Sequence, residues 1–297
     1  MKQKNNQIKY ILITAARNEQ DYIGQTIESI INQTLTPVKW FIVNDCSTDN
    51  TEKILKKYQE QVPFIRIINI AEIKNRNFSS KVDAINLALE QAKNMEYDFL
   101  GILDADITFS ADYYQSVTEI FAKNKNLGIS GGYIYEKQNG VFKSRMKNVP
   151  WSVAGAVQLY HSGCFKQIGR FFHSPLGGED WYMEINARMN GWEVESLPQI
   201  KAFHHRITGA SAKSDFQRRF QEGIQDYVMG SILLFELVKC ARRLGEKPFF
   251  LGAFYRFLGY LTSAITNKPK IATKEMQAFL KMEQKKRLTN IFKIFKS

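Results

Sequence analysis

Short apolar runs alternate with helical patterns through the N-terminal part of the chain, and this alternation constrains the fold more than any other feature. Predominantly apolar runs typical of buried strands occur at residues 10–14, 40–43, 64–68 and 99–103. Helical patterns lie between them: a face made by Ile23, Ile27, Ile30 and Ile31, a segment over 51–58, and a segment capped by Ser80. This order predicts an α/β fold with a mostly parallel sheet flanked by helices.

The pattern is less regular after Gly131-Gly132. We expect residues 136–150 to form a mobile loop. Gly177 and the residues after it are expected to open a helix that runs to about Asn190 and ends at Gly191, before a strand over 192–197. Residues beyond about 211 are helical and basic. We therefore expect one domain over residues 1–210 and a basic amphipathic helical extension over 211–297.

The positive charge is concentrated near the C-terminus. The net charge is +12, and residues 239–297 carry 14 Lys and Arg against three Glu. An anionic partner is therefore expected for this segment alone. Cys46, Cys164 and Cys240 form no CxxC pair, which argues against zinc and disulfides and suits a reducing cytosol. The N-terminus has no apolar signal region, so secretion is not expected.

Two aspartates follow the last of the four predicted strands. Asp104 and Asp106 stand directly after the apolar run at 99–103. Ligands bind outside the carboxyl ends of strands in open α/β sheets, so both carboxylates are expected at a ligand site. Their oxygens suit Mg²⁺ or Mn²⁺, which can hold a diphosphate. The alternative is that one aspartate caps a helix and the other belongs to a turn.

Several such segments occur in a fixed order along the chain. They are Thr14–Glu19, Asn44–Thr51, Lys81, Asp104–Asp106 and Gly178–Asp180. Together they resemble glycosyltransferase family 2, the inverting enzymes of GT-A fold, over about residues 8–210. The resemblance implies a GT-A catalytic domain, a nucleotide-sugar donor, a divalent cation and a carboxylate base. It also implies transfer to a lipid-linked or glycan acceptor in cell-envelope or exopolysaccharide biosynthesis.

The resemblance implies a donor site at the ends of the first strands. Its predicted residues are Ala15, Arg17, Asn18, Glu19, Asp45, Arg76, Lys81 and Asp104. Asp45 would accept the imide N–H of uracil, so we expect a UDP-linked donor. Arg17 stands where the family usually has an aromatic residue, and a guanidinium can also stack on a base. Lys81 and Arg76 could neutralise the diphosphate, although each could equally be a solvated surface cation.

The expected metal site combines the two aspartates with a histidine pair. Asp106 is predicted to bind Mg²⁺ or Mn²⁺ directly, and Asp104 to reach the ribose or a metal-bound water. The resemblance places a histidine near His204 and His205, at the end of a later strand, where it could complete the metal shell. The alternative is a surface histidine pair without function.

Asp180 is the predicted catalytic base, with Glu179 beside it. Inverting transfer needs a carboxylate near the acceptor hydroxyl. The preceding glycines would give the backbone freedom for close approach. The alternative is that both carboxylates only cap the helix that starts there.

The C-terminal segment has an amphipathic pattern. One predicted helical face holds Phe250, Phe254, Phe257, Leu258, Leu261 and Ile265, and the other holds Gly252, Arg256, Gly259 and Ser263. Apolar residues recur at 288–295 among further cations. Such helices lie in a membrane interface or dock on their own protein. The first possibility predicts a cytoplasmic protein, peripheral at the inner face of the cell membrane and bound to anionic lipid.

The sequence also bears on three other classes of protein. A catalytically silent nucleotide-binding scaffold at the membrane surface would keep the fold, but the carboxylates at 104, 106 and 180 argue against it. Nucleic-acid binding is weakened because the basic excess is confined to the C-terminal segment and has no recognition motif. A dinucleotide-dependent dehydrogenase would need a G-x-G-x-x-G after the first strand, and none is present.

Overall fold

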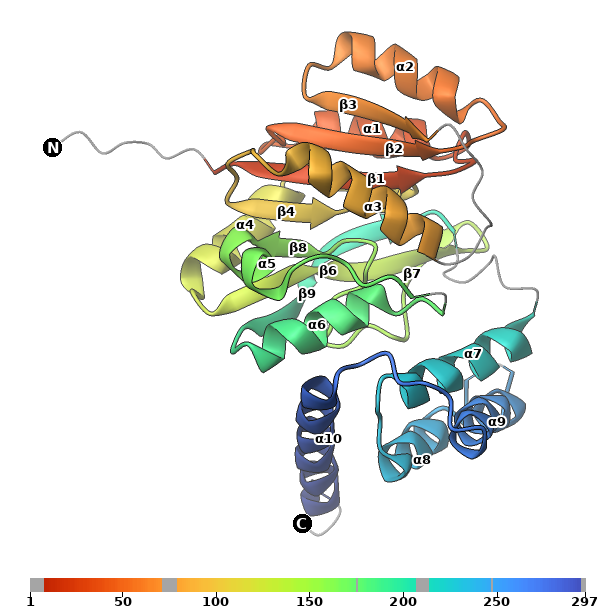
Figure 1. Ribbon diagram of the computed structural model, residues 1–297. Coiled ribbons are helices and arrows are strands. Elements are labelled where there is room, and N and C mark those ends of the chain that lie inside the picture. Colours follow the sequence, from red (N-terminus) through yellow and green to blue (C-terminus); the bar gives the residue numbers. More distant parts are fainter. Residues whose placement is uncertain (1–7, 71–78, 175, 207–213, 247, 295–297) are drawn as a thin grey trace, which may run out of the picture. The chain divides into compact units, whose positions relative to one another are not determined.

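The computed structural model describes residues 8–70, 79–174, 176–206, 214–246 and 248–294. These residues form two compact units, which are described separately. Unit 1 lies within residues 1–175 and 179–208, and unit 2 lies within residues 176–178 and 209–297. Unit 1 holds the sheet and its flanking helices, and unit 2 holds α7 to α10 (Figure 1).

The N-terminal half of unit 1 is a parallel sheet. Its elements are β1 (Tyr10–Ala16), α1 (Ile23–Ile31), β2 (Lys39–Asp45), α2 (Thr51–Gln61), β3 (Ile65–Ile70), α3 (Ser79–Ala92) and β4 (Phe99–Ile102). The strands pair in the order β3-β2-β1-β4. Figure 1 shows α3 in front of these strands and α1 behind them. Because helices cover both faces, β1 is apolar and buried almost throughout, as such strands require. The predicted strand–helix order is confirmed.

The second half of unit 1 extends the sheet with mixed pairing. It contains β5 (Ile107–Phe109), α4 (Tyr113–Lys123), β6 (Leu127–Gln138), β7 (Val141–Ser144), β8 (Leu159–His161), α5 (Ser162–Ile168), α6 (Glu179–Met189) and β9 (Glu193–His204). The order continues β4-β8-β6-β9-β5. β8 is antiparallel to β4 and β6, whereas β6 and β9 are parallel. The sheet is therefore parallel on the β3 side and mixed beyond β4.

The segment expected to be a loop contains a hairpin. β6 and β7 pair as antiparallel strands, with Gln138 opposite Val141. Asn139 and Gly140 have φ angles of 50° and 81°, which fits the tight turn that an Asn-Gly pair favours between two strands. The prediction of a loop over 136–150 is therefore wrong for the hairpin strands. The Asn-Gly pair is the signal that could have revealed them.

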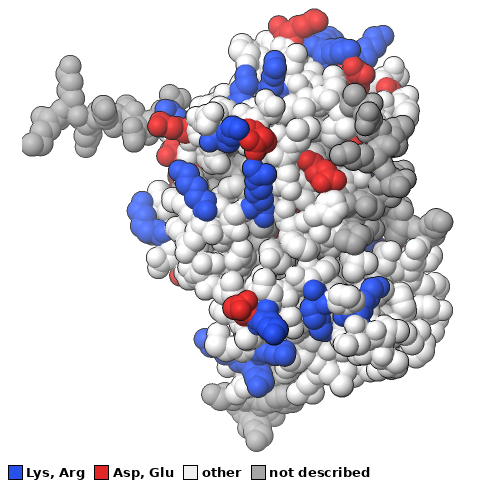
Figure 2. Space-filling view, in the orientation of Figure 1, with Lys and Arg blue, Asp and Glu red and all other residues white. Residues whose placement is uncertain are grey.

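Unit 2 is helical, with α7 (Asp215–Val228), α8 (Leu233–Arg242), α9 (Leu251–Ile265) and α10 (Lys274–Ile294). α7 and α9 pack so closely that a Cβ atom at Gly223 or Gly259 would collide with backbone atoms of the other helix. Lys and Arg predominate over Asp and Glu on the surface of unit 2 seen in Figure 2. Among the helices of the described residues, none is long and apolar enough to cross a membrane.

Candidate active site

The Asp104–Asp106 turn is fixed from two sides in unit 1. The backbone N–H of Leu103 donates to the carbonyl of Ile13 on β1 (3.0 Å). On the other side, the Thr26 hydroxyl on α1 donates to the carbonyl of Ala105 (2.8 Å). Neither aspartate caps a helix, because α4 begins only at Tyr113. The alternative interpretation, in which one of the two aspartates caps a helix, is therefore wrong.

Asp104 and the two predicted catalytic carboxylates, Glu179 and Asp180, all act electrostatically on Lys81. The ammonium of Lys81 on α3 lies 2.6 Å from Asp104 Oδ1. Burial lowers the pKa of Lys81, but Asp104, Glu179 and Asp180 together hold it above its ordinary value. Burial and the neighbouring Asp180 raise the pKa of Glu179, which Lys81 lowers in turn. The structure therefore brings together residues from α3, the β4 end and the start of α6.

Asp106 occupies a separate buried cluster. Its Oδ2 atom lies 3.0 Å from His204 Nε2 and accepts a hydrogen bond from Arg206 Nε (2.6 Å). A second nitrogen of Arg206 lies 2.6 Å from Glu19 Oε1. Although burial acts in the opposite direction, His204 and Arg206 hold the pKa of Asp106 below its ordinary value. Arg206 was not predicted, although it follows the two histidines directly in sequence.

Glu19 is the least satisfied member of this cluster. Burial raises its pKa to about 7, although Arg206 acts to lower it. Its Oε2 atom is buried and has no hydrogen-bond partner among the described residues. The backbone N–H of His205 donates to the carbonyl of Asp106 (3.0 Å), but its imidazole contacts the Thr108 hydroxyl at 2.9 Å. The two predicted histidine side chains therefore point to different partners, and only the His204 imidazole contacts the Asp106 carboxylate.

The carboxylates, the imidazole and the orphaned Glu19 oxygen are donors that Mg²⁺ or Mn²⁺ accepts. Across the part of the chain that the structure describes, however, no three His, Cys, Asp or Glu side chains are grouped closely enough to hold a metal ion. Here the Asp106 carboxylate contacts the His204 imidazole and the Arg206 guanidinium. The residue types at this sheet edge fit a divalent cation. Their closest contacts, however, are with one another, in a network that links Asp106, His204, Arg206 and Glu19.

The predicted base-recognition residues lie at the ends of β1 and β2. Arg17 Nη1 is 3.4 Å from Asp45 Oδ2. Asp49, rather than Asp45, accepts the backbone N–H of Thr51 at the start of α2 (2.9 Å). Asp45 therefore does not cap α2.

Other predicted donor residues differ in their roles. Asn18 has a φ of 55°, and its side-chain oxygen accepts the backbone N–H of Thr48 (2.8 Å). It therefore joins the turn after β2 to the end of β1. Ala15 pairs with Val43 within the sheet. Arg76 lies outside the described residues.

Asp180 is held by a segment that sequence patterns did not single out, residues 152–158. The backbone N–H of Gly155 donates to Asp180 Oδ2 (3.2 Å). A Cβ atom at Gly155 would lie 2.7 Å from that oxygen and 2.8 Å from Asp180 Cβ, so only glycine allows this approach. The other carboxylate oxygen accepts the N–H of Trp181 (2.8 Å). Asp180 thus contacts both the start of α6 and this segment.

The same segment connects Asp180 with Asp104. The N–H of Asp104 donates to the carbonyl of Ala156 (3.0 Å). One turn beyond Asp180, Glu184 accepts the N–H of Val153 (2.6 Å) and the Ser152 hydroxyl (3.2 Å). Burial raises the pKa of Glu184 to about 8. Glu184 therefore anchors the segment on α6, so that the segment bridges the two carboxylates.

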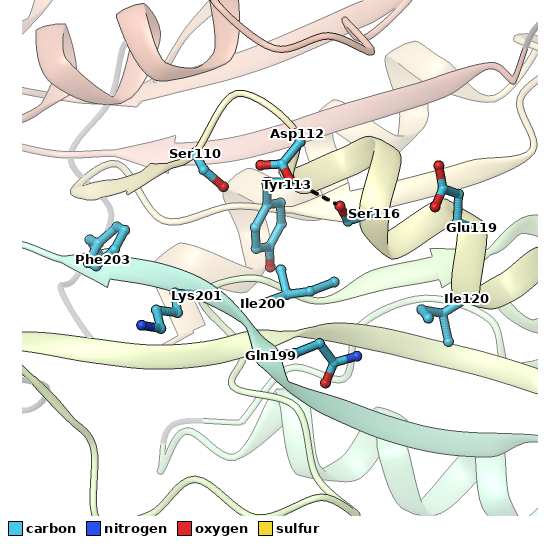
Figure 3. Close-up of a pocket in the computed structure, with 10 residues that line it drawn as sticks. All are labelled: Ser110, Asp112, Tyr113, Ser116, Glu119, Ile120, Gln199, Ile200, Lys201 and Phe203. Carbon is cyan, nitrogen blue, oxygen red and sulfur yellow. Dashed lines mark hydrogen bonds between the residues drawn. The ribbon is translucent and has the colours of Figure 1, made fainter.

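A pocket of about 350 Å³ lies elsewhere on unit 1, between α4 and β9 (Figure 3). It is lined by Ser110, Asp112, Tyr113, Ser116, Glu119, Ile120, Gln199, Ile200, Lys201 and Phe203. None of these residues was predicted to bind the donor, a metal or the acceptor. The candidate active site is therefore the carboxylate-rich sheet edge and not this pocket.

Solved structures resemble the chain in fold. A mannosyltransferase from Pyrobaculum calidifontis, solved in complex with GDP-Man and Mn²⁺, aligns with a TM-score of 0.58 at 16% identity, over 88% of this chain and 74% of that one. S. aureus TarS 1-349 in complex with UDP-GlcNAc aligns with a TM-score of 0.54 at 16% identity, over 92% and 78%. At this identity the likeness shows the fold alone, which is GT-A.

Two sequence relatives are named for the synthesis of teichuronic acid and of poly-beta-1,6-N-acetyl-D-glucosamine. The chain is 29% identical to a putative teichuronic acid biosynthesis glycosyltransferase of Bacillus subtilis, TuaG, over 48% of this chain and 53% of the relative. It is 29% identical to poly-beta-1,6-N-acetyl-D-glucosamine synthase of Staphylococcus epidermidis, over 67% and 50%. The chain thus spans about half the length of these relatives. The family profile of Glycosyl transferase family 2 matches residues 11–179, more than half of the chain. The chain therefore belongs to glycosyl transferase family 2.

Proposed function

We propose that this glycosyltransferase moves a sugar from a UDP-linked donor to a hydroxyl acceptor, with inversion at the anomeric carbon. The observation that carries the proposal is the grouping of Asp104, Lys81, Glu179 and Asp180 at one edge of the sheet. A cation beside a carboxylate-rich site suits a diphosphate leaving group, and a second carboxylate nearby suits proton removal. The relatives solved with UDP-GlcNAc and with GDP-Man support a nucleotide-sugar donor.

At the donor end, Asp45 and Arg17 are proposed to receive the base, with Ala15, Asn18 and Glu19 shaping the floor around it. Asp104, Asp106 and His204 would hold Mg²⁺ or Mn²⁺. The ion would neutralise charge on the departing diphosphate. Lys81, already beside Asp104, would bind a diphosphate oxygen and oppose the same negative charge. The Mn²⁺ in the Pyrobaculum calidifontis complex supports a divalent ion in this fold.

At the acceptor end, Asp180 is proposed as the base. It would accept the proton of the acceptor hydroxyl as that oxygen attacks the anomeric carbon from the face opposite the diphosphate. Glu179 lies beside Asp180 in sequence, and burial together with this neighbour raises the pKa of Glu179. The Gly155 N–H orients one oxygen of Asp180. The catalytic domain is proposed to span residues 1–210.

The acceptor is proposed to be a lipid-linked or glycan hydroxyl in cell-envelope polysaccharide biosynthesis. The names of the Bacillus and Staphylococcus relatives support this class. The excess of positive charge in residues 239–297 supports an anionic membrane surface as partner of the C-terminal extension. We therefore propose a cytoplasmic enzyme, peripheral at the inner face of the cell membrane.

Thermal stability of the purified protein tests the donor. With Mn²⁺ and UDP-sugars, GDP-sugars, TDP-sugars and CMP-sugars in turn, we expect only a UDP-sugar to raise the Tm. The rise should be about 5 °C at roughly 100 times the Kd. Asp106→Asn should abolish it. Asp112→Asn, at an exposed aspartate of the α4 pocket, should retain it. A shift with GDP-sugars alone would refute the UDP assignment, and no shift with any donor would favour a silent scaffold.

Replacing Gly155 tests the placement of the base. Because a Cβ at this position would overlap Asp180, Gly155→Ala should displace the carboxylate and lower kcat about 100-fold, with donor binding retained. Gly24→Ala on α1 is the matched control, because its Cβ would meet nothing closer than 3.9 Å. The test compares the single-turnover rates of Gly155→Ala and Gly24→Ala. Equal rates would show that Asp180 need not be held in this position.

A further inference from the structure

Two helices of unit 2 turn their polar sides inward and their apolar sides outward. α9 buries Gly252, Arg256, Gly259 and Ser263, yet Phe254 is 58% exposed and Ile265 is 75% exposed. α8 does the same, with Glu236 fully buried and Leu234 51% exposed. An ordinary amphipathic helix of a water-soluble domain does the reverse. Unit 2 therefore leaves uncovered the apolar surface that its sequence places on these helices.

A buried charge network fixes this orientation. The guanidinium of Arg256 on α9 contacts three carboxylates: Glu222 (2.6 Å) and Asp226 on α7, and Glu236 on α8 (2.9 Å). Lys239 on α8 also pairs with Asp226, at 2.5 Å. Turning α9 to bury its phenylalanines would strip Arg256 of all these partners. The outward direction of the apolar side is therefore built into the packing.

We define the α8–α9 face by its exposed apolar residues. They are Leu233, Leu234, Leu237, Phe249, Phe250, Leu251, Phe254, Leu261 and Ile265, each at least 36% exposed. In Figure 2 the surface over α8 and α9 is mostly neither acidic nor basic. So many large apolar side chains on two neighbouring helices mark a surface that is covered in the working state.

The distribution of charge within unit 2 points to what covers the α8–α9 face. Carboxylates of α7 and α8, among them Glu222, Asp226 and Glu236, are used inside unit 2 in ion pairs. Lysines of α10 such as Lys281, Lys285 and Lys286 stay exposed. Protein interfaces are depleted in lysine, whereas anionic lipid headgroups attract it. Phe, Leu and Ile beside Lys and Arg are the composition of helices that lie in a membrane interface.

We propose that the α8–α9 face is the surface through which this protein seats in the interface of an anionic bilayer. α8 and α9 would lie along the membrane, with the phenylalanines and leucines at the boundary between headgroups and acyl chains. This inference deepens the proposed function, because it rests on a membrane-located acceptor and names the surface that would reach it. Binding to lipid itself requires neither donor nor acceptor, so it can be measured independently of catalysis.

Vesicle flotation of the full chain tests the proposal. With equal amounts of phosphatidylcholine and phosphatidylglycerol, the wild-type protein should float, and it should float less with phosphatidylcholine alone. The double variant Leu237→Ser/Phe254→Ser should lose roughly tenfold or more in partition. Both side chains are exposed, so the variant should keep its circular dichroism spectrum and donor-dependent Tm shift. Val141→Ser/Met146→Ser is the control, because these residues of unit 1 are 60% and 73% exposed.

Three outcomes would overturn the proposal. One is a wild-type protein that stays unbound with anionic vesicles. Another is a Leu237→Ser/Phe254→Ser variant that floats as well as the wild type. The third is a wild-type dimer by light scattering that the double variant converts to monomers without any lipid binding, which would assign the face to a second copy of the chain. Failure of the UDP-sugar Tm shift would count against the proposed function and leave the flotation result intact.

Discussion

Asp180→Asn is expected to lower the turnover roughly 10²–10⁴-fold while the protein stays folded and still binds its donor. The amide keeps the shape of the side chain, and its oxygen can still accept the N–H of Gly155, which holds Asp180 at 3.2 Å. It cannot accept a proton from the acceptor hydroxyl. Initial rates of sugar transfer, with the Tm shift on donor addition as the measure of binding, give the comparison.

A matched control separates loss of the base from a general effect of replacing an aspartate in unit 1. Asp83→Asn is the matched control, because Asp83 is an exposed aspartate of α3 whose contact is His173 (3.2 Å). Asp83→Asn should behave as the wild type. Near-wild-type turnover in Asp180→Asn would remove this residue from the mechanism.

Arg256→Met is expected to lower the free energy of unfolding of unit 2 by about 3–5 kcal/mol. The methionine would fill much of the space of the arginine stem, but Glu222, Asp226 and Glu236 would lose their shared cation in a buried site. Arg242→Met, at an exposed position of α8, should change stability by no more than about 0.5 kcal/mol.

The two units can be followed separately in this experiment. Trp40, Trp151, Trp181 and Trp192 are all the tryptophans of the chain, and all lie in unit 1. Tryptophan fluorescence therefore reports unit 1, and amide hydrogen exchange in α7–α9 reports unit 2. Arg256→Met should speed exchange there. Adding Glu236→Gln should restore part of the loss, because it removes a buried carboxylate that Arg256 balanced, whereas Asp226 keeps its pair with Lys239. Unchanged exchange in Arg256→Met would mean that the network does not hold these helices.

The sequence predicts the N-terminal half of unit 1 well because helices bury both faces of its strands. A strand covered by helices on both faces must be apolar along its whole length, so β1 is visible without any tertiary information. β8 is only three residues long, from Leu159 to His161, and gives no such pattern. The β6–β7 hairpin depends on its Asn139-Gly140 turn, a local signal that periodicity does not contain.

The carboxylates of the candidate site stand out in the sequence, whereas the residues that contact them do not. Asp104, Asp106 and Asp180 follow recognisable segments, whereas Arg206 matters because it reaches Glu19, 187 residues away in sequence. Glu184 is similar, because its partners at 152 and 153 come from another segment. Periodicity of α9 correctly separates its two faces, but it does not reveal which face is buried. That choice depends on three carboxylates from α7 and α8.

The tight turn between β6 and β7 also offers a place to modify the molecule. Val141, directly after the turn, is 60% exposed. Chain insertions and attached groups are tolerated best at exposed loop tips of this kind. A fluorophore carried on residue 141 would report on unit 1. The β6–β7 hairpin, which the apolar periodicity of the sequence does not reveal, is thus a suitable attachment point for an optical probe of this enzyme.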